Sequence, residues 1–431
     1  MGRRSNGTAT RTRARTITGG AAALALVAGS FGTIALEAPA AGAKGQSHDS
    51  TASGPVNQQL PKGVRKAPSG LGFYKAPTPL PPGEPGDIIW AAPYQAVPGA
   101  KAWKVLYHSR SLAGDDIAVS GVIVVPDGKA PAGGRPVISW AHGTHGIADN
   151  CAPSRVNDWV PRMPAIKSLV EQGYVVAATD YEGLGTPGTH PYLVGESEAR
   201  GTLDVVRAAR NLPGSDASAQ TVVWGHSQGG QASLFAGEIA PTYAPELDLR
   251  GIVAGAPVTD VAAMFPAAST IPATLGFVVM GLQGIQAAFP DADAQDVLTP
   301  QAIAKADKIV NSKCYEDVLA AFNQPVSEVI GANPADVAPF PELFARDTTG
   351  NVATAAPQFV YQGKSDDVVY KVFTDAYVKK VCGMGNTVEY TTFGGKDHYE
   401  ENDAAEAQIL DWIRGRLAGD AAPSSCATLP S

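Results

Sequence analysis

Cysteine is scarce in this sequence, and basic residues are outnumbered by acidic ones. The four cysteines never show Cys-x-x-Cys spacing, which argues against a redox-active pair or a zinc site built from cysteines. The formal net charge is -8, with 33 basic against 41 acidic residues. A net acidic chain argues against nucleic acid or an anionic surface as a partner.

One apolar stretch near the N-terminus has the features of a targeting segment. Residues 19–36 are rich in alanine, leucine and valine, and the fifteen residues that open the chain hold five arginines and no acid. Small residues at 38–40 and 41–43 offer cleavage sites, so we predict a signal peptide over residues 1–43 rather than a membrane anchor. Its removal takes away five arginines and one glutamate, which leaves 28 basic and 40 acidic residues and a formal charge of about -12. We expect a secreted, extracellular protein with no integral membrane span in the mature chain.

The most informative motif is Gly-His-Ser-Gln-Gly at residues 225–229. The β-branched run at 220–224 predicts a buried strand before it, and the sequence from Gln228 onward predicts a helix. A serine at such a turn has a strained backbone that exposes its hydroxyl, and the two glycines leave room for the tight turn. The pattern predicts Ser227 as a nucleophile and the backbone N–H of Gln228, at a helix N-terminus, as an oxyanion donor.

The order of residues along the chain then selects a general base. Where a serine occupies this kind of turn, the acid and then the histidine follow it in the sequence. Of the seven histidines, His398 alone follows Ser227. It lies in a loop between a predicted strand at 388–393 and a predicted amphipathic helix at 404–417. We therefore expect His398 to be the base.

The acid of the triad is expected between these two residues. Residues 357–363 predict a strand, and the pair Asp366 and Asp367 follows it. Asp366 is the preferred acid and Asp367 the reserve. Its role would be to accept a hydrogen bond from Nδ1 of His398, which fixes the tautomer and stabilises the imidazolium.

A second oxyanion donor is expected in a loop after an early strand. Residues 135–141 predict that strand, and His-Gly-Thr-His-Gly follows at 142–146. Thr144 is the expected donor, through its amide or its hydroxyl. The two histidines of this loop have no acidic or cysteine cluster beside them, and the acidic residues at 291–296 lack the pattern of a calcium loop. We expect no metal and no cofactor.

Predicted strands and helices alternate along the chain, which is typical of an α/β fold. A helix is predicted at 197–209. The predicted strands are 105–108, 117–125, 137–141, 175–179, 221–224, 251–254, 358–361 and 388–393. We expect a core made of residues 72–260 and 350–431, preceded by a flexible lead at 44–71.

The strand pattern disappears in the segment between the nucleophile and acid regions. There, apolar residues recur at helical spacing, as in 301–310, so we predict a mostly helical cap over 261–349. Residues 271–289 are markedly apolar, but their glycines and glutamines argue against a membrane span. They are interpreted as a buried cap helix, one face of which could also line a tunnel for an acyl chain.

Together these motifs resemble the secretory lipases of the lipase A type, a family of the α/β-hydrolase superfamily. The resemblance covers most of the mature chain and includes Phe73-Tyr74-Lys75-Ala76-Pro77, Trp140-Ala141-His142-Gly143-Thr144, Cys151-Ala152-Pro153-Ser154 and Thr179-Asp180-Tyr181-Glu182-Gly183. It implies an α/β-hydrolase fold, with Ser227, Asp366 and His398 as the triad and Thr144 and Gln228 at the oxyanion positions. Yeast members of the family carry an acidic residue near the first oxyanion position, where this chain has threonine.

The cysteines of a secreted chain are expected to form disulfides. Four cysteines in an even set predict two bonds with three possible pairings. The resemblance implies the pairs Cys151 with Cys314 and Cys382 with Cys426.

We expect a secreted serine hydrolase of carboxylic esters, either a triacylglycerol lipase or a lipid esterase, that forms an acyl-enzyme on Ser227. Its partners would be an ester or lipid substrate and, transiently, a lipid–water interface. A short-chain carboxylesterase and a peptidase of the same fold remain as alternatives. A non-catalytic lipid-binding protein is the alternative from a different class.

Overall fold

A nine-stranded sheet organises the chain in the computed structural model, which describes residues 58–429. The signal peptide predicted for residues 1–43 and the start of the predicted lead lie outside these residues. The strand order is β1-β2-β3-β5-β4-β6-β7-β8-β9. The strands are β1 Ile88–Tyr94, β2 Ala100–Arg110, β3 Asp116–Pro126, β4 Arg135–Ala141, β5 Val175–Thr179, β6 Ala217–His226, β7 Asp248–Gly255, β8 Gln358–Gly363 and β9 Val388–Phe393.

The sheet is antiparallel at one end and parallel over the rest. Strands β1, β2, β3 and β5 pair antiparallel in that order, whereas β5, β4, β6, β7, β8 and β9 pair in parallel. Every residue of β5 and β8 is buried, as expected for parallel strands that are covered on both faces. The α/β fold predicted from the sequence is confirmed.

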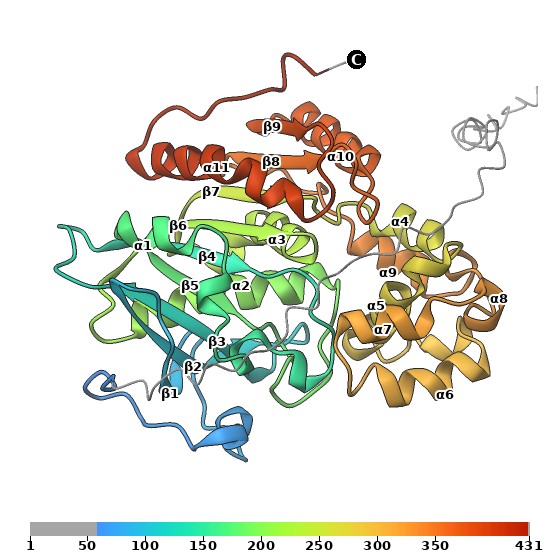
Figure 1. Ribbon diagram of the computed structural model, residues 1–431, viewed down its shortest axis with the longest axis horizontal. Coiled ribbons are helices and arrows are strands. Elements are labelled where there is room, and N and C mark those ends of the chain that lie inside the picture. The colour runs from blue at the N-terminus through green and yellow to red at the C-terminus, as the bar shows by residue number, and fades with distance from the viewer. Residues whose placement is uncertain (1–57, 430–431) are drawn as a thin grey trace, which may run out of the picture. The chain divides into compact units, whose positions relative to one another are not determined.

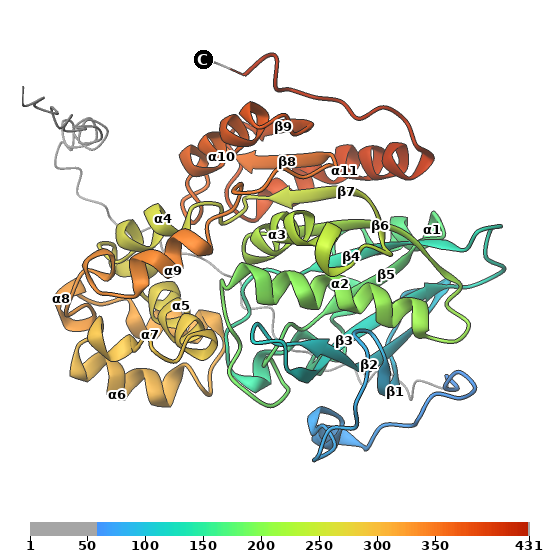
Figure 2. The same cartoon turned by 180° about the vertical axis from the view of Figure 1, so that it is seen from behind.

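Helices cover both faces of the sheet (Figures 1 and 2). One face packs against α2, α3 and α10, and the other against α1 and α11. These helices are α1 Ile166–Glu171, α2 Gly195–Asn211, α3 Gln228–Tyr243, α10 Lys371–Gly383 and α11 Glu400–Ala418. Successive residues of β6 alternate between the two faces, since Trp224 contacts the cluster around α11 and Val223 contacts the cluster around α2.

The segment between β7 and β8 is helical and lies at the side of the sheet where the parallel strands end (Figures 1 and 2). It contains α4 Val261–Ala268, α5 Leu275–Ala288, α6 Pro300–Ile309, α7 Tyr315–Phe322, α8 Val326–Val329 and α9 Phe340–Arg346. We call this segment the helical insertion. Its helices bury a hydrophobic cluster of their own, which includes Val279, Leu282, Phe322 and Phe344.

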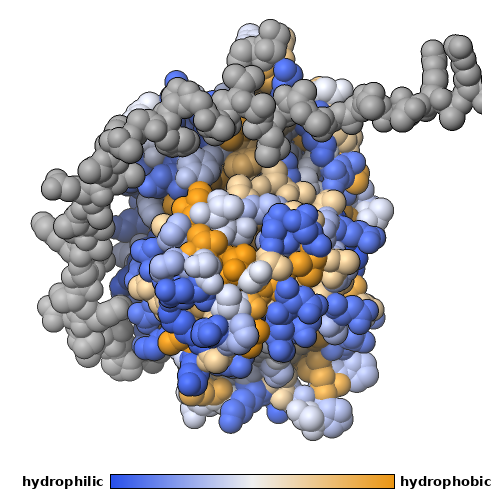
Figure 3. Space-filling model, turned by 90° about the vertical axis from the view of Figure 1, so that its right-hand side faces the viewer, coloured by the Kyte–Doolittle hydropathy of each residue, from blue (hydrophilic) through white to orange (hydrophobic). Residues whose placement is uncertain are grey.

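The apolar stretch near residues 271–289 forms α5 and the short turn before it. Leu275, Val279 and Leu282 are fully buried within the insertion. Between residues 58 and 429, no single helix is long and apolar enough to cross a membrane, while the pair Val261–Ala268 and Pro272–Ala288 passes that test together but is bent by 120°. Figure 3 shows the side of the molecule that lies on the right in Figure 1, where the helical insertion is found. Hydrophobic residues form patches among hydrophilic ones on this side.

Two disulfide bonds connect distant segments. Cys151, which follows β4, is bonded to Cys314, the residue before α7. Cys382, at the end of α10, is bonded to Cys426 in the C-terminal segment. These are the two pairs that the resemblance implies. The first bond attaches the helical insertion to the loop region of the sheet, and the second fixes the C-terminal segment beside α10.

The described part of the predicted lead lies against the sheet. The side chain of Gln58 donates a hydrogen bond to the carbonyl oxygen of Ala102, 2.9 Å away. Lys66 forms a β-bridge with Ala91, and Leu60 and Val64 pack against the cluster between the sheet and α2. Between Gln58 and Ala67, the chain is therefore in contact with the sheet through both backbone and side chains.

Candidate active site

Ser227 lies between the last residue of β6 and the first residue of α3. Its backbone angles are φ 60° and ψ -121°, a conformation that non-glycine residues rarely adopt and that costs about 1–3 kcal/mol. The surrounding backbone holds it there. The Ser227 N–H donates to the carbonyl oxygen of Gly255 at 2.9 Å, and its own carbonyl accepts from the N–H of Gln231 at 3.2 Å.

The two glycines of the motif are required by close backbone contacts. A Cβ atom on Gly225 would lie 2.0 Å from the carbonyl oxygen of Gly229, and one on Gly229 would lie 2.0 Å from that of Ala141. Both distances are far shorter than any real contact of a Cβ atom. The strand, the helix and the end of β4 can thus approach one another only where no side chain stands between them.

His398 and Asp366 lie side by side after β9 and β8. The Nδ1–H of His398 donates to Oδ2 of Asp366 at 2.8 Å, and both residues are buried. The carboxylate also accepts from the side chain of Gln362 at 2.8 Å and from the N–H groups of Val368 and Val369 at 2.9 Å each. Four donors thus fix the orientation of this carboxylate.

The neighbouring aspartate is placed differently. Asp367 is exposed, whereas Asp366 is the one that contacts His398. The structure thus brings the preferred acid, and not the reserve, to the histidine. The catalytic roles themselves stay predictions.

Ser227 and His398 line the same cavity, which has a volume of about 190 Å³. The loop after β4 contributes to this cavity, and so do residues of α5 and α7 in the helical insertion. The other lining residues are Gly143, Thr144, His145, His226, Phe277, Tyr315, Val368 and Tyr399. The predicted nucleophile, base and first oxyanion residue, which lie far apart in the sequence, therefore meet at one site.

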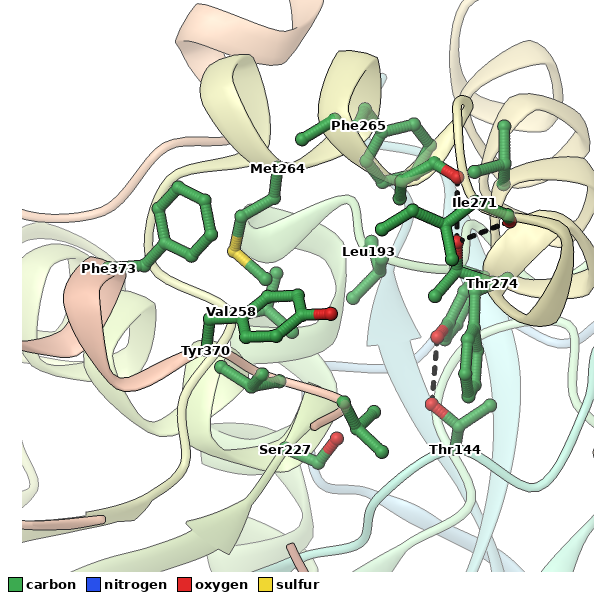
Figure 4. Close-up of a pocket in the computed structure, with 17 residues that line it drawn as sticks. Thr144, Leu193, Ser227, Val258, Met264, Phe265, Ile271, Thr274, Tyr370 and Phe373 are labelled. Carbon is green, nitrogen blue, oxygen red and sulfur yellow. Dashed lines mark hydrogen bonds between the residues drawn. The ribbon is translucent and has the colours of Figure 1, made fainter. Parts of the chain in front are cut away.

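A second cavity of about 90 Å³ begins at Ser227 and Thr144 and extends between α4 and α5. Figure 4 shows Ser227 and Thr144 at one end and Met264, Phe265 and Ile271 toward the other. Except for a few hydroxyl groups, the lining side chains are apolar. A cavity of this kind favours the hydrocarbon part of a substrate over a charged or peptide-like one.

The two predicted oxyanion residues belong to different segments beside the serine. Gln228 is the first residue of α3, so its backbone N–H has no partner within the helix. Thr144 lies in the loop after β4, and its Oγ1 is 2.8 Å from the hydroxyl of Tyr192. A Cβ atom on Gly143 would lie 3.3 Å from the carbonyl oxygen of His226, so this loop runs directly against the serine turn.

Two buried titratable residues next to the site were not found from the sequence. Oε1 of Glu401 lies 3.3 Å from Nε2 of His226, and its Oε2 accepts from the N–H of Gly363. Burial raises the pKa of Glu401 to about 9. Burial and the neighbouring His398 hold the pKa of His226 well below its ordinary value. His226 is therefore neutral beside the predicted base, with ring centroids 4.6 Å apart.

No local pattern could have indicated this pair. Glu401 lies in the first turn of α11, where an acidic residue is common for reasons of the helix dipole alone. Its contact with His226 spans 175 positions of the sequence. Among the described residues, no group of three or more histidine, cysteine or acidic side chains is arranged to hold a metal ion.

The geometry and the comparisons with known proteins define the class. A strained serine on a strand-to-helix turn, with a histidine–aspartate pair after later strands of a mostly parallel sheet, is typical of α/β-hydrolases that cleave esters. The secretory lipase family model matches residues 162–425. Because the match covers more than half of the chain, the protein belongs to the secretory lipase family and is a carboxylic ester hydrolase.

Individual relatives span nearly the whole chain at low identity. Lipase 6 of Candida albicans is 26% identical over 401 residues, which covers 84% of each chain. The probable inactive lipase MT1628 of Mycobacterium tuberculosis is 24% identical over 392 residues, with 85% and 86% covered. The closed state of Candida antarctica lipase A is similar in fold, with a TM-score of 0.69 at 20% identity, 85% of this chain and 88% of that chain being covered.

The raised pKa of Glu401 predicts a dependence of stability on pH. An unfolded glutamate titrates near pH 4.3, whereas Glu401 in the folded protein holds its proton to about pH 9. Its contribution to stability is therefore complete below the unfolded pKa and is lost as the pH rises toward the folded one. We expect Glu401→Gln, which cannot ionise, to show a shallower fall in the free energy of unfolding between pH 5 and 9, measured by urea titration.

Glu400→Gln is the matched control. Glu400 is the exposed neighbour of Glu401, and its carboxylate lies 3.7 Å from Nζ of Lys396. Glu400→Gln should show the same dependence of the free energy of unfolding on pH as wild type. If Glu401→Gln also falls as steeply as wild type between pH 5 and 9, the carboxyl of Glu401 does not titrate in that range.

Proposed function

We propose that this chain is a secreted lipase or lipid esterase that cleaves carboxylic esters through an acyl-enzyme on Ser227. The observation that carries the proposal is the hydrogen bond between His398 and Asp366 at the cavity that the strained serine lines. Membership of a secretory family, the predicted signal peptide and two disulfide bonds support an extracellular location.

In the proposed reaction Ser227 Oγ attacks the ester carbonyl while Nε2 of His398 accepts its proton. Asp366 holds the Nδ1–H and stabilises the imidazolium. The backbone N–H of Gln228 and the amide or hydroxyl of Thr144 hold the negative oxygen of the tetrahedral intermediate. When the bond to the leaving oxygen breaks, His398 donates its proton to the departing alcohol. Water then attacks the acyl-enzyme while His398 accepts its proton. His398 returns that proton to Ser227 Oγ as the bond between Oγ and the acyl carbon breaks and the carboxylic acid leaves.

The apolar cavity supports a substrate with a hydrocarbon acyl chain. It starts at the nucleophile and is lined by side chains of α4 and α5. Tyr370 lines this cavity and is 44% exposed, and Tyr399 lines the neighbouring cavity and is 58% exposed. Exposed aromatic side chains beside both cavities would favour transient contact with a lipid–water interface.

The size of the same cavity favours a second candidate, a short-chain carboxylesterase. Its volume of about 90 Å³ is well below the roughly 300–1,000 Å³ of typical ligand sites. A long acyl chain would need α4 and α5 to separate. Acyl-chain length therefore distinguishes the two candidates.

The first experiment measures hydrolysis of p-nitrophenyl esters from acetate to palmitate by wild type and by Ser227→Ala. We expect the variant to lose at least about 10⁴-fold in kcat, since the residual rate lacks the nucleophile. Serine-dependent turnover that persists on palmitate would support a lipase, and turnover confined to acetate and butyrate would support a short-chain esterase. Absence of serine-dependent turnover on every ester would overturn the proposal and favour a peptidase or a non-catalytic lipid-binding protein.

The second experiment compares the two neighbouring aspartates. Asp366→Asn keeps the shape of the side chain but changes the hydrogen bond to Nδ1 of His398, so we expect kcat to fall by about 10⁴-fold. Asp367→Asn, the matched exposed control, should keep kcat near the wild-type value. A larger loss in Asp367→Asn than in Asp366→Asn would contradict the proposed triad.

A further inference from the structure

One buried carboxyl on α2, Glu198, contacts the proposed oxyanion donor Gln228 directly and also contacts the loop before α2, which in turn contacts Thr144. Glu198 lies in the first turn of α2 and is 0% exposed. Its Oε1 accepts a hydrogen bond from Nε2 of Gln228 at 2.7 Å and another from the backbone N–H of Leu193 at 2.9 Å. None of the triad residues contacts it through a recorded hydrogen bond.

The first contact fixes the beginning of α3. Nε2 of Gln228 lies 2.7 Å from Glu198 and 2.9 Å from Nε2 of His190. Nδ1 of His190 lies 2.9 Å from the carbonyl oxygen of Glu182, so that nitrogen carries the hydrogen and Nε2 is the acceptor. Burial lowers the pKa of His190 to about 4, which keeps the ring neutral. Both side-chain amide hydrogens of Gln228 therefore have acceptors, so its side chain cannot rotate freely. The backbone N–H of the same residue is the proposed oxyanion donor.

The second contact fixes the loop before α2, whose residue Tyr192 contacts Thr144. Leu193 has a positive φ of 62°, which is uncommon for a leucine and needs support from its surroundings. The bond from its N–H to Glu198 provides that support. The adjacent Tyr192 is buried, and its hydroxyl lies 2.8 Å from Oγ1 of Thr144. Glu198 is thus connected through Leu193 and Tyr192 to the second donor.

We propose that Glu198 is a positioning residue that sets the two oxyanion donors relative to each other. The inference rests on the proposed ester hydrolysis at Ser227. Donors that are fixed before the reaction stabilise a developing charge without having to reorient, and displacement by about 1 Å can cost 10²-fold in rate. The chain uses one acceptor atom to join the start of α3 with the loop at residues 190–194.

The chemistry of the carboxyl makes a conservative rescue possible. Its Oε2 has no hydrogen-bond partner among the described residues, and burial raises the pKa of Glu198 to about 8. The raised pKa favours the protonated carboxyl near neutral pH, and Glu198→Gln keeps both its shape and its acceptor oxygen. Glu198→Met keeps the approximate volume but leaves the side chain of Gln228 and the N–H of Leu193 without an acceptor.

The test measures kcat and KM on p-nitrophenyl butyrate, with active sites counted by titration with a fluorophosphonate. For Glu198→Met we expect kcat per titrated site to fall roughly tenfold or more, because loss of a whole oxyanion donor costs about 10²–10³-fold. KM should stay within about threefold, because the interaction belongs to the transition state. Glu198→Gln should recover kcat to within about threefold of wild type.

Asp204 provides a control on the same helix. It is also a fully buried acid, bonded to Ser109, Tyr243 and Arg207 rather than to the site. Asp204→Asn should lower the melting temperature and leave kcat per titrated site unchanged. If Glu198→Met also lowers the melting temperature but leaves kcat per titrated site unchanged, as expected for Asp204→Asn, the inference is overturned.

A boronic acid gives a readout that a purely structural role would not move. An alkylboronic acid forms a tetrahedral adduct with a serine nucleophile, so its inhibition constant reports on the oxyanion donors. We expect that constant to rise in Glu198→Met in parallel with the loss of kcat/KM, and to rise less when Thr144→Val is already present.

Tyr192→Phe tests the same connection between Glu198 and Thr144 if Glu198→Met does not fold, because it removes only the hydroxyl that contacts Thr144. It should raise the inhibition constant, and an unchanged value would overturn the inference.

The two proposals can fail separately. If Ser227→Ala keeps its activity, or if the boronic acid does not bind wild type, the proposed ester hydrolysis fails. If both behave as expected while the Glu198 and Tyr192 variants keep wild-type kcat and inhibition constants, the positioning role alone fails.

Discussion

The close backbone contact at Ser227 is the constraint on which the rest of the site depends. β6, α3 and the end of β4 approach so closely that a Cβ atom on either glycine of the motif would lie 2.0 Å from a carbonyl oxygen. This approach holds the serine at φ 60°, where its hydroxyl points away from the sheet. The cost of about 1–3 kcal/mol for such a conformation is offset by the packing around it. The backbone conformation of the proposed nucleophile is therefore fixed by the fold before any substrate binds.

The parallel part of the sheet then determines what can reach that serine. Loops that follow β4, β6, β8 and β9 leave the sheet at the same edge, since the carboxyl ends of parallel strands lie together. Thr144, Ser227, Asp366 and His398 come from these four loops. The helical insertion follows β7 at the same edge and adds an apolar cavity. Positioning of the polar groups and binding of a hydrocarbon chain are thus assigned to different parts of the chain.

Much of the architecture was predictable because its signals are local. The buried parallel strands are short β-branched runs, and the insertion shows helical spacing. The glycines of the motif and the single histidine after Ser227 were enough to predict Ser227 as the nucleophile and His398 as the base without any spatial information. The edge strand β1 was not predicted, since it contains Pro93 and is antiparallel. β2 runs from Ala100 to Arg110, well beyond the predicted 105–108, because polar residues at 101, 104 and 108–110 break any regular alternation of apolar and polar side chains.

The supporting polar residues could not be predicted for a different reason. Glu198 contacts Gln228 across 30 positions, and Glu401 contacts His226 across 175. Each looks in the sequence like an ordinary acid in the first turn of a helix, where acids are common. Only the folded chain shows that these carboxyls are buried beside the site. Their pKa values are raised chiefly by burial, and carboxylates that the fold brings near add to the effect.

The central claim is that Ser227 becomes acylated during turnover. The most direct measurement is to mix the enzyme with p-nitrophenyl butyrate, quench with acid within the pre-steady state, and locate the modified peptide by mass spectrometry. We expect a butyryl group on Ser227, with none on the protein in Ser227→Ala. Ester turnover without an acylated Ser227, or with acyl transfer to another residue, would contradict it.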